Sequence, residues 1–251
     1  MSDSLKNIRI VLCDTRHPGN IGSTARAMKT MGLSQLYLVN PHLFPDKQAD
    51  WLATNAVDVL EQATVCADLD TALSGVVLAV ACTARSREIA VPAVTAREAA
   101  ARLVEVAHTQ PVALVFGSEV RGLTTDQVKR CQMVATILTD ASHSSLNLAA
   151  AVQVFAYELR LHAVEQTLPT GVTGANMPRN LATHEEIELF YAHLERELMA
   201  CGFLNPAQPK RFMQRVRRMF ARMQLEHEEV KILRGVVRTL RTPKKRGDRD
   251  E

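Results

Sequence analysis

The sequence has little of what marks a secreted, metal-binding or membrane-spanning protein. Its five cysteines are odd in number and far apart, without a Cys-x-x-Cys pair, which favours free thiols in the reducing cytoplasm over disulfides or a zinc site. No apolar run approaches the roughly 20 residues that cross a bilayer, and no signal-peptide core is present, so we expect no membrane association. The eight histidines lack ligand spacing, and we expect no metal.

The chain also lacks a strong charge of either sign. Thirty lysines and arginines face 27 acidic residues, which leaves a net charge of +3. A nucleic-acid partner would therefore be met by a local patch rather than by the field of the whole protein. With 251 residues and a hydrophobic fraction of 47%, the chain is long enough for one large domain and a small one.

Short runs rich in Val, Ile and Leu alternate with helical patterns along the first two thirds of the chain. This alternation is typical of an α/β fold in which helices cover both faces of a parallel sheet. The predicted strands span residues 8–13, 36–39, 76–81, 112–116 and 134–138. The predicted helices span residues 21–31, 96–107, 124–131 and 146–164, and a loop with a short helix is expected over residues 40–51.

The alternation stops near residue 166, and the composition then turns helical and charged. We interpret the chain as a large domain, a linker, a small all-α extension and a disordered tail, over residues 1–165, 166–182, 183–242 and 243–251. In the extension, Thr183 and Glu186 form a capping-box pattern and Gly202 ends that helix. Asn205-Pro206 marks the start of a second helix, and residues 225–242 form a third.

Three polar blocks interrupt the apolar sequence of the large domain. Block one covers residues 17–26, block two residues 116–124 and block three residues 144–148. Each follows, or nearly follows, an apolar run and opens onto a helix-like stretch. Open α/β sheets bind ligands at the carboxyl ends of their strands, so we expect the blocks to converge on one crevice.

Each block alone has an ordinary structural explanation. In block one, Arg26 suits a phosphate, although a surface helix with a solvated arginine is as good an interpretation. In block two, Gly117 and Gly122 flank Glu119, a spacing that a plain strand-turn-helix connection also explains.

Block three offers two kinds of helix cap. Ser144 or Ser145 as N-cap of the next helix is sufficient to explain the serines. Asn147 is harder to explain, because asparagine is unfavourable in a first helical turn unless its amide is used.

Taken together, the strings Asn20-Ile21-Gly22-Ser23, Ala25-Arg26-Ala27-Met28-Lys29 and Ser145-Leu146-Asn147-Leu148 resemble the motifs of the SPOUT superfamily of knotted methyltransferases. The resemblance covers about residues 8–164 and is greatest to TrmJ-type tRNA 2′-O-ribose methyltransferases. It implies a trefoil knot near residues 112–164, S-adenosylmethionine as cofactor, and an obligate homodimer whose active sites are completed by the partner subunit. The implied substrate is the ribose of a cytidine or uridine at position 32 of the tRNA anticodon loop.

The resemblance also implies which side chains carry the chemistry. Arg26 would orient the 2′-hydroxyl, bind the adjacent RNA phosphate and stabilise developing alkoxide charge. Glu119 and Asn20 would hold Arg26 in place, and Ser145 and Asn147 would shape the pocket. Cofactor contacts are expected from Cys82, Thr83, Ala84, Gly117, Ile137, Ser144, Ser145 and Leu146.

One position departs from this family's usual pattern. Ser118 stands where such enzymes usually carry an arginine, and Arg121, a little further along the chain, is the residue that could supply the missing charge to RNA.

A second basic feature needs no family knowledge. Four arginines recur at i, i+4, i+7 and i+11, which aligns them on one helical face: Arg211, Arg215, Arg218 and Arg222. Apolar residues follow one position later, so the helix would pack through one face and contact phosphates with the other. The alternative is a solvated face neutralised by glutamates such as Glu226 and Glu228.

Some alternatives to a tRNA methyltransferase retain methyl transfer and others do not. A ribosomal RNA methyltransferase keeps it, whereas a non-catalytic RNA-binding module of the same fold would explain Ser118. A dehydrogenase would need G-x-G-x-x-G after the first strand, which block one lacks. Trp51 is interpreted as a packing residue rather than a base-stacking platform, and Cys82 as a small buried filler.

Overall fold

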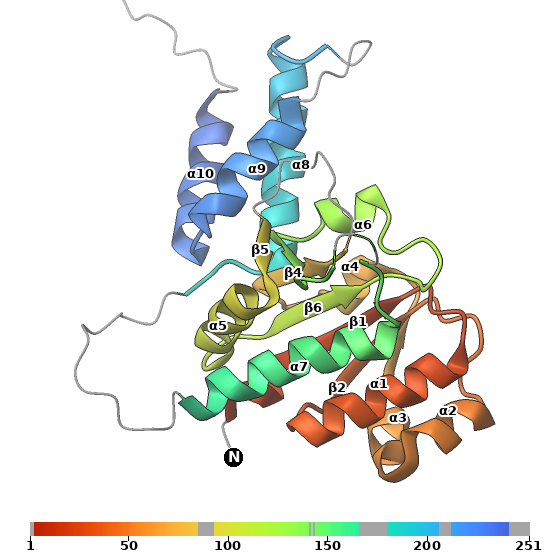
Figure 1. Ribbon diagram of the computed structural model, residues 1–251. Coiled ribbons are helices and arrows are strands. Elements are labelled where there is room, and N and C mark those ends of the chain that lie inside the picture. Colours follow the sequence, from red (N-terminus) through yellow and green to blue (C-terminus); the bar gives the residue numbers. More distant parts are fainter. Residues whose placement is uncertain are drawn as a thin grey trace, which may run out of the picture. The chain divides into compact units, whose positions relative to one another are not determined.

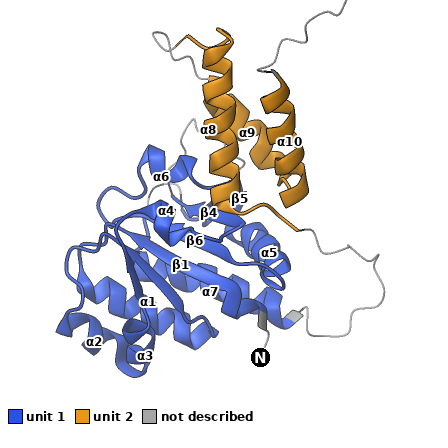
Figure 2. Cartoon of the chain, turned by 180° about the vertical axis from the view of Figure 1, so that it is seen from behind, with its two compact units in different colours: residues 1–178 blue, residues 179–251 orange. Residues whose placement is uncertain are grey.

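The computed structural model of the chain describes residues 3–84, 93–140, 142, 144–165, 180–205 and 212–240. The chain forms two compact units, residues 1–178 and 179–251 (Figure 2). Within the described ranges, no helix is long and apolar enough to cross a membrane. Most of the predicted linker, the helix start at Pro206 and the predicted tail 243–251 lie outside the described residues.

The first unit is built on a parallel sheet, seven-stranded over the described residues, in the order β3-β2-β1-β6-β4-β7-β5 (Figure 1). The strands are β1 (Ile8–Cys13), β2 (Gln35–Val39), β3 (Thr64–Cys66), β4 (Leu78–Cys82), β5 (Ala93–Thr95), β6 (Val112–Phe116) and β7 (Met133–Thr136). The predicted parallel α/β sheet is confirmed. Strands β3 and β5 were missed because each is short and lies at an edge.

The helices of this unit are α1 (Pro18–Met31), α2 (Lys47–Ala53), α3 (Val57–Glu61), α4 (Leu69–Ala72), α5 (Ala96–Ala107), α6 (Thr125–Lys129) and α7 (Leu148–Glu165), with 3-10 turns at Asp3–Asn7 and Thr54–Ala56. Helix α1 begins earlier than predicted because Pro18 occupies its first turn, where a missing amide hydrogen costs nothing. It ends at Gly32, whose φ of +82° is left-handed, as the predicted stop requires.

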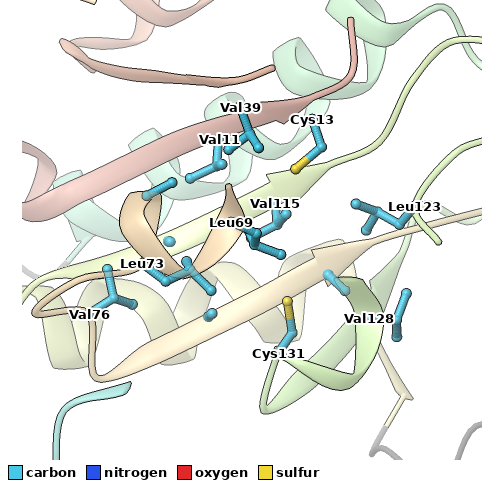
Figure 3. Close-up of a cluster of buried hydrophobic side chains, with 14 of the residues drawn as sticks. Val11, Cys13, Val39, Leu69, Leu73, Val76, Val115, Leu123, Val128 and Cys131 are labelled. Carbon is cyan, nitrogen blue, oxygen red and sulfur yellow. The ribbon is translucent and has the colours of Figure 1, made fainter. Parts of the chain in front are cut away.

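Helices cover both faces of the sheet. One face is covered by α4 and α6 (Figure 3). Here Val11 and Val115 of the central strands pack against Leu69 of α4, Leu73 at its C-terminal end and Val128 of α6. On the other face, α7 packs against α1 and α5. There Phe116 of β6 meets Phe155 of α7 edge to face, with ring centroids 5.6 Å apart. The central strands are buried as a result, which accounts for their nearly continuous apolar sequence.

Helix α2 packs directly on α1 at a glycine, Gly22. A Cβ at Gly22 would lie 2.0 Å from the carbonyl oxygen of Ala49, so no side chain fits there. The contact turns Ala49 and Ala53 toward α1, and Trp51 between them points the other way. The prediction that Trp51 packs is therefore wrong, since the residue is 75% exposed.

The second unit consists, in its described part, of helices α8 (His184–Ala200), α9 (Phe212–Met223) and α10 (His227–Leu240). Its core joins residues from all three, among them Phe190, Val216 and Val230. The capping box of Thr183 and Glu186 is confirmed, and Gly202 follows α8 with a left-handed φ of +77°.

Candidate active site

The three polar blocks meet at the carboxyl ends of the strands, as expected. Glu119, in the loop after β6, accepts a hydrogen bond from Asn20 Nδ2 at 2.8 Å. Asn20, in the first turns of α1, accepts in turn from Asn147 Nδ2 at 3.0 Å. Asn147 immediately precedes α7. One chain of side-chain hydrogen bonds thus joins the end of β6 to the starts of α1 and α7.

Glu119 is held as a carboxylate. Besides Asn20, it accepts from the backbone amides of Arg16 at 3.0 Å and His17 at 3.2 Å. Partial burial alone would raise the pKa of Glu119, but the hydrogen bonds from Asn20 and the backbone amides together outweigh it and lower the pKa. The ionised side chain only accepts hydrogen bonds, so it acts as an anchor for block one.

Asn147 has a second function at the start of α7. Its Oδ1 accepts from the backbone amides of Ala149 at 2.9 Å and Ala150 at 3.4 Å, which makes Asn147 the N-cap. The interpretation of Ser144 or Ser145 as N-cap is therefore wrong. The cap also explains why an asparagine is tolerated at this position, because its oxygen serves the helix while its nitrogen serves Asn20.

A pocket lies beside this hydrogen-bonded chain. Every predicted cofactor-binding residue lines it, namely Cys82, Thr83, Ala84, Gly117, Ile137, Ser144, Ser145 and Leu146. Phe116 and Phe155 form part of an apolar wall, and Glu119 contributes a charge. A surface that combines aromatic and aliphatic walls with a few hydroxyls and a carboxylate is typical of a site for a small organic ligand.

The thiol in the pocket is unreactive. Cys82 is only 9% exposed, and burial raises its pKa well above the ordinary range. It therefore stays protonated at neutral pH, in agreement with its interpretation as a small buried filler.

Ser118 and Arg121 form one turn at the rim of the pocket. The Ser118 carbonyl accepts from the Gly122 amide at 2.8 Å, and the Ser118 hydroxyl accepts from the Arg121 amide at 3.3 Å. The Arg121 side chain is exposed, and its neighbours Val120 and Gly122 both line the pocket.

Arg26 lies apart from the hydrogen-bonded chain. It is further along α1, about 9 Å from Asn20 along the helix axis, and its side chain is exposed. Among the described residues, Glu119 and Asn20 bond to each other, to Asn147 and to the backbone after β1, and not to Arg26. The role of Glu119 and Asn20 in holding Arg26 in place therefore stays a prediction, since no direct bond between them is present in the described part of the chain.

The arginines of α9 divide into two kinds. Arg217 forms a bidentate pair with Glu188, at 2.6 and 2.8 Å, and stacks over Tyr191 at 4.4 Å. Three others are exposed and, within the described parts of the chain, join no carboxylate: Arg215, Arg218 and Arg222. Glu228 pairs with Lys231 instead, at 2.9 Å. Arg211, the fourth member of the predicted face, lies outside the described residues.

Two family models match the chain. The model of the SpoU rRNA methylase family covers residues 7–157. That of the C-terminal domain of tRNA methyltransferase TrmJ covers residues 185–250. The chain belongs to the SpoU rRNA methylase family.

Relatives within the SpoU family span nearly the whole chain. The tRNA (cytidine/uridine-2′-O-)-methyltransferase TrmJ of Pectobacterium atrosepticum is 46% identical over 233 residues, which are 93% of this chain and 96% of the relative. That of Klebsiella pneumoniae is 46% identical over 239 residues, with coverage of 94% and 97%. The crystal structure of TrmJ from Z. mobilis is 32% identical with a TM-score of 0.79, and the match covers 93% of this chain and 99% of that one. The TrmJ-type resemblance of the sequence is confirmed.

Some pocket residues of this SpoU family member were not among the predicted cofactor contacts. Leu148, Ala151 and Phe155 line the pocket from α7. Their i, i+3, i+7 spacing puts them on one helical face directly after block three, and this period was the available signal. The backbone amides of Arg16 and His17, which bond Glu119, left no signal, because backbone donors are present at almost every residue.

Proposed function

We propose that this protein is an S-adenosylmethionine-dependent methyltransferase that modifies the 2′-hydroxyl of a cytidine or uridine ribose in tRNA, at position 32 of the anticodon loop. The observation that carries the proposal is the pocket, which unites residues of all three blocks next to the Glu119–Asn20–Asn147 chain. The names of the TrmJ relatives support both the reaction and the class of substrate.

The pocket fits the cofactor in its chemistry. Apolar walls from Phe116, Ile137 and Leu146 suit a planar base, while the hydroxyls of Ser144 and Ser145 suit a ribose. The Glu119 carboxylate suits a cationic ligand, because it remains ionised at neutral pH. When bound, S-adenosylmethionine supplies a methyl group on a positively charged sulfur. The residues of the chain hold the reactants in line, which can contribute several kcal/mol to lowering the barrier.

Arg26 is the proposed catalytic residue. Arginine stays protonated at ordinary pH, so it orients the 2′-hydroxyl and stabilises alkoxide charge rather than removing the proton. Its exposure and its separation from Glu119 support a homodimer in which Arg26 completes the site of the partner subunit. Asn20, Glu119, Ser145 and Asn147 are proposed to shape the pocket.

The proposed RNA contacts come from both units. The exposed arginines of α9, together with Arg211, would contact phosphates and make residues 183–242 an RNA-binding extension of the methyltransferase domain. Arg121, exposed at the pocket rim, would contact RNA close to the reacting ribose. A ridge of arginines that lacks carboxylate partners among the described residues supports this assignment.

Two further features belong to the same proposal. The first is a trefoil knot near residues 112–164, which rests on the resemblance to the knotted methyltransferases and on the match of residues 7–157 to the SpoU family. The second is a cytoplasmic location, supported by the substrate and by four cysteines that are free and buried: Cys13, Cys66, Cys82 and Cys131.

A ribosomal RNA substrate is the second candidate, because the family model that matches residues 7–157 is described by rRNA methylation. The two candidates share the chemistry and differ in the RNA.

The test is transfer of a labelled methyl group from S-adenosylmethionine to unmodified tRNA and, in parallel, to unmodified ribosomal RNA, followed by nucleoside mapping. We expect a 2′-O-methyl mark at position 32 of tRNA. Label confined to ribosomal RNA would establish the second candidate. Absence of cofactor binding would contradict both and leave a non-catalytic RNA-binding module.

A further inference from the structure

Two neighbouring strands end in non-glycine residues with left-handed backbone. Asp14, directly after β1, has a φ of +53°, and Asn40, directly after β2, has a φ of +48°. Their side chains bond each other, with Asn40 Nδ2 donating to Asp14 Oδ1 at 3.0 Å. Non-glycine residues in this region are uncommon and cluster at functional sites, so the pair calls for an explanation.

The second oxygen of Asp14 reaches a different element. Gln127 Nε2, on α6, donates to Asp14 Oδ2 at 3.0 Å. The orientation of this amide is fixed, because Gln127 Oε1 accepts from the backbone amide of Thr124 at 2.8 Å as part of the capping box of α6. The Gln127 nitrogen therefore faces Asp14, and an acceptor is required at residue 14.

The consequence concerns the loop of residues 117–124, which forms one wall of the pocket. Near its start, Glu119 bonds the amides of Arg16 and His17. At its end, Thr124 is bonded to Gln127, and Gln127 to Asp14. The short segment of residues 14–20 therefore holds this pocket loop at both ends.

We propose that Asp14 is a positioning residue for the methyl-transfer site. It does not line the pocket; through Gln127 it fixes the end of the loop whose start carries Glu119. The identity of the ligand rests on the proposed function above, whereas the link between Asp14 and the loop rests on the hydrogen bonds alone.

An exchange of the two side-chain types tests the proposal. Gln127→Glu sets two carboxylates against each other. Asp14→Asn leaves one oxygen at position 14, so the introduced amide nitrogen faces either Gln127 Nε2 or Asn40 Nδ2. The double variant restores the bond with its direction reversed, because the amide introduced at position 14 would donate to the carboxylate introduced at position 127. Each of the two side chains keeps its other partner in that arrangement. Asparagine also tolerates left-handed backbone, so the substitution leaves the strand end unstrained.

We expect Gln127→Glu to weaken S-adenosylmethionine binding, measured by calorimetry, by about tenfold, the value of one hydrogen bond, and Asp14→Asn to weaken it by at most that factor. We expect the double variant to return to within about twofold of the wild type. Amide hydrogen exchange in residues 117–124 should accelerate in the single variants and recover in the double variant. Gln132→Glu is the matched control. The Gln132 side chain accepts from the Ala79 amide through its Oε1, at 2.7 Å, and the substitution retains an oxygen there.

Unchanged affinity in both single variants, with a lower melting temperature, would reduce Asp14 to a structural residue. A double variant as impaired as the single ones would also overturn the proposal. If the wild type does not bind S-adenosylmethionine at all, the proposed function fails, and the exchange rates of residues 117–124 still decide whether Asp14 positions the loop.

Discussion

The polar side chains of the two units are arranged in opposite ways. In the first unit, Glu119, Asn20 and Asn147 bond one another at 2.8 and 3.0 Å, and Glu119 takes two backbone amides besides. In the second unit, three arginines of α9 project from the surface without a carboxylate partner among the described residues. Fixed geometry is what a reaction centre needs, whereas mobile surface charge suits a polyanion whose phosphates need only be near.

The same contrast occurs within α9 between adjacent residues. Arg217 is held by Glu188 and Tyr191, while Arg218 is exposed. Neighbours on a helix point about 100° apart, so one side chain faces α8 and the next faces solvent. A charged residue's role therefore follows from its helical face and not from its type.

The largest expected effect is on Arg26. Arg26→Ala should lower kcat by about 10²-fold or more, because the charge proposed to stabilise the transition state is removed, whereas the loss of one phosphate contact should weaken tRNA binding far less. Single-turnover methylation and filter binding measure the two quantities. Lys29→Ala, which removes only a surface pair with Asp58, is the control on the same helix. Wild-type turnover in Arg26→Ala would contradict the catalytic role.

Removing Glu119 tests the fixed geometry of the first unit. Glu119→Ala deprives the amides of Arg16 and His17 and the side chain of Asn20 of their acceptor. We expect a loss of about 1–3 kcal/mol in the free energy of unfolding, measured in urea, together with weaker cofactor binding. A variant that keeps full stability and full affinity would show that the hydrogen-bonded chain does not organise the site.

The adjacent arginines of α9 provide a matched pair in the second unit. Arg217→Ala should cost about 2 kcal/mol in stability, because the bidentate pair with Glu188 and the stacking on Tyr191 are both lost. Arg218→Ala should change stability by less than about 0.5 kcal/mol. Amide hydrogen exchange in α8 and α9 of the full-length protein measures the stability loss in each variant. Equal losses in the two variants would show that Arg217 and Arg218 do not differ in their structural role.

The exposed arginines are expected to determine the salt dependence of binding. The double variant Arg215→Ala, Arg218→Ala should reduce the slope of log affinity for tRNA against log salt by about 0.7–0.9 for each phosphate that is no longer neutralised. An unchanged slope would return this face to a solvated surface. Arg217→Ala serves as the control, provided that the temperature keeps the variant folded.

The smallest expected effect is on pH dependence. The pKa of Glu119 is lowered in the folded protein, so its contribution to stability is complete above the ordinary value of about 4.3 and is lost as the pH falls through the folded-state value. Glu119→Gln, which does not titrate, should therefore lose less stability than the wild type on acidification from about pH 5 to pH 3. If the stability of both proteins fell equally with pH, the Glu119 carboxylate would not be stabilised by its hydrogen-bond donors.

Local signals in the sequence are sufficient to predict some elements of the fold. Strand β6 and helix α5 have the predicted bounds, because a break precedes each element and the apolar period is clear. The predicted crevice followed from the polar blocks at the strand ends and from strand polarity. The residues expected to contact the cofactor came from the resemblance to the knotted methyltransferases. Local signals do not predict contacts that depend on residues far apart in the sequence. Ser144, Ser145 and Asn147 are all good helix caps, and Asn147 also meets Asn20, far away in sequence. The bond between Asp14 and Gln127 was invisible for the same reason.

The contact of Gly22 with Ala49 also gives the protein an intrinsic fluorescence probe. Because Gly22 of α1 lies against the backbone of Ala49, we expect a displacement of α1 at this point to move α2. The single tryptophan of the chain, Trp51, lies on the outer side of α2 and is largely in water. Its fluorescence is therefore an intrinsic reporter for events at the start of α1, without a dye and without a substitution.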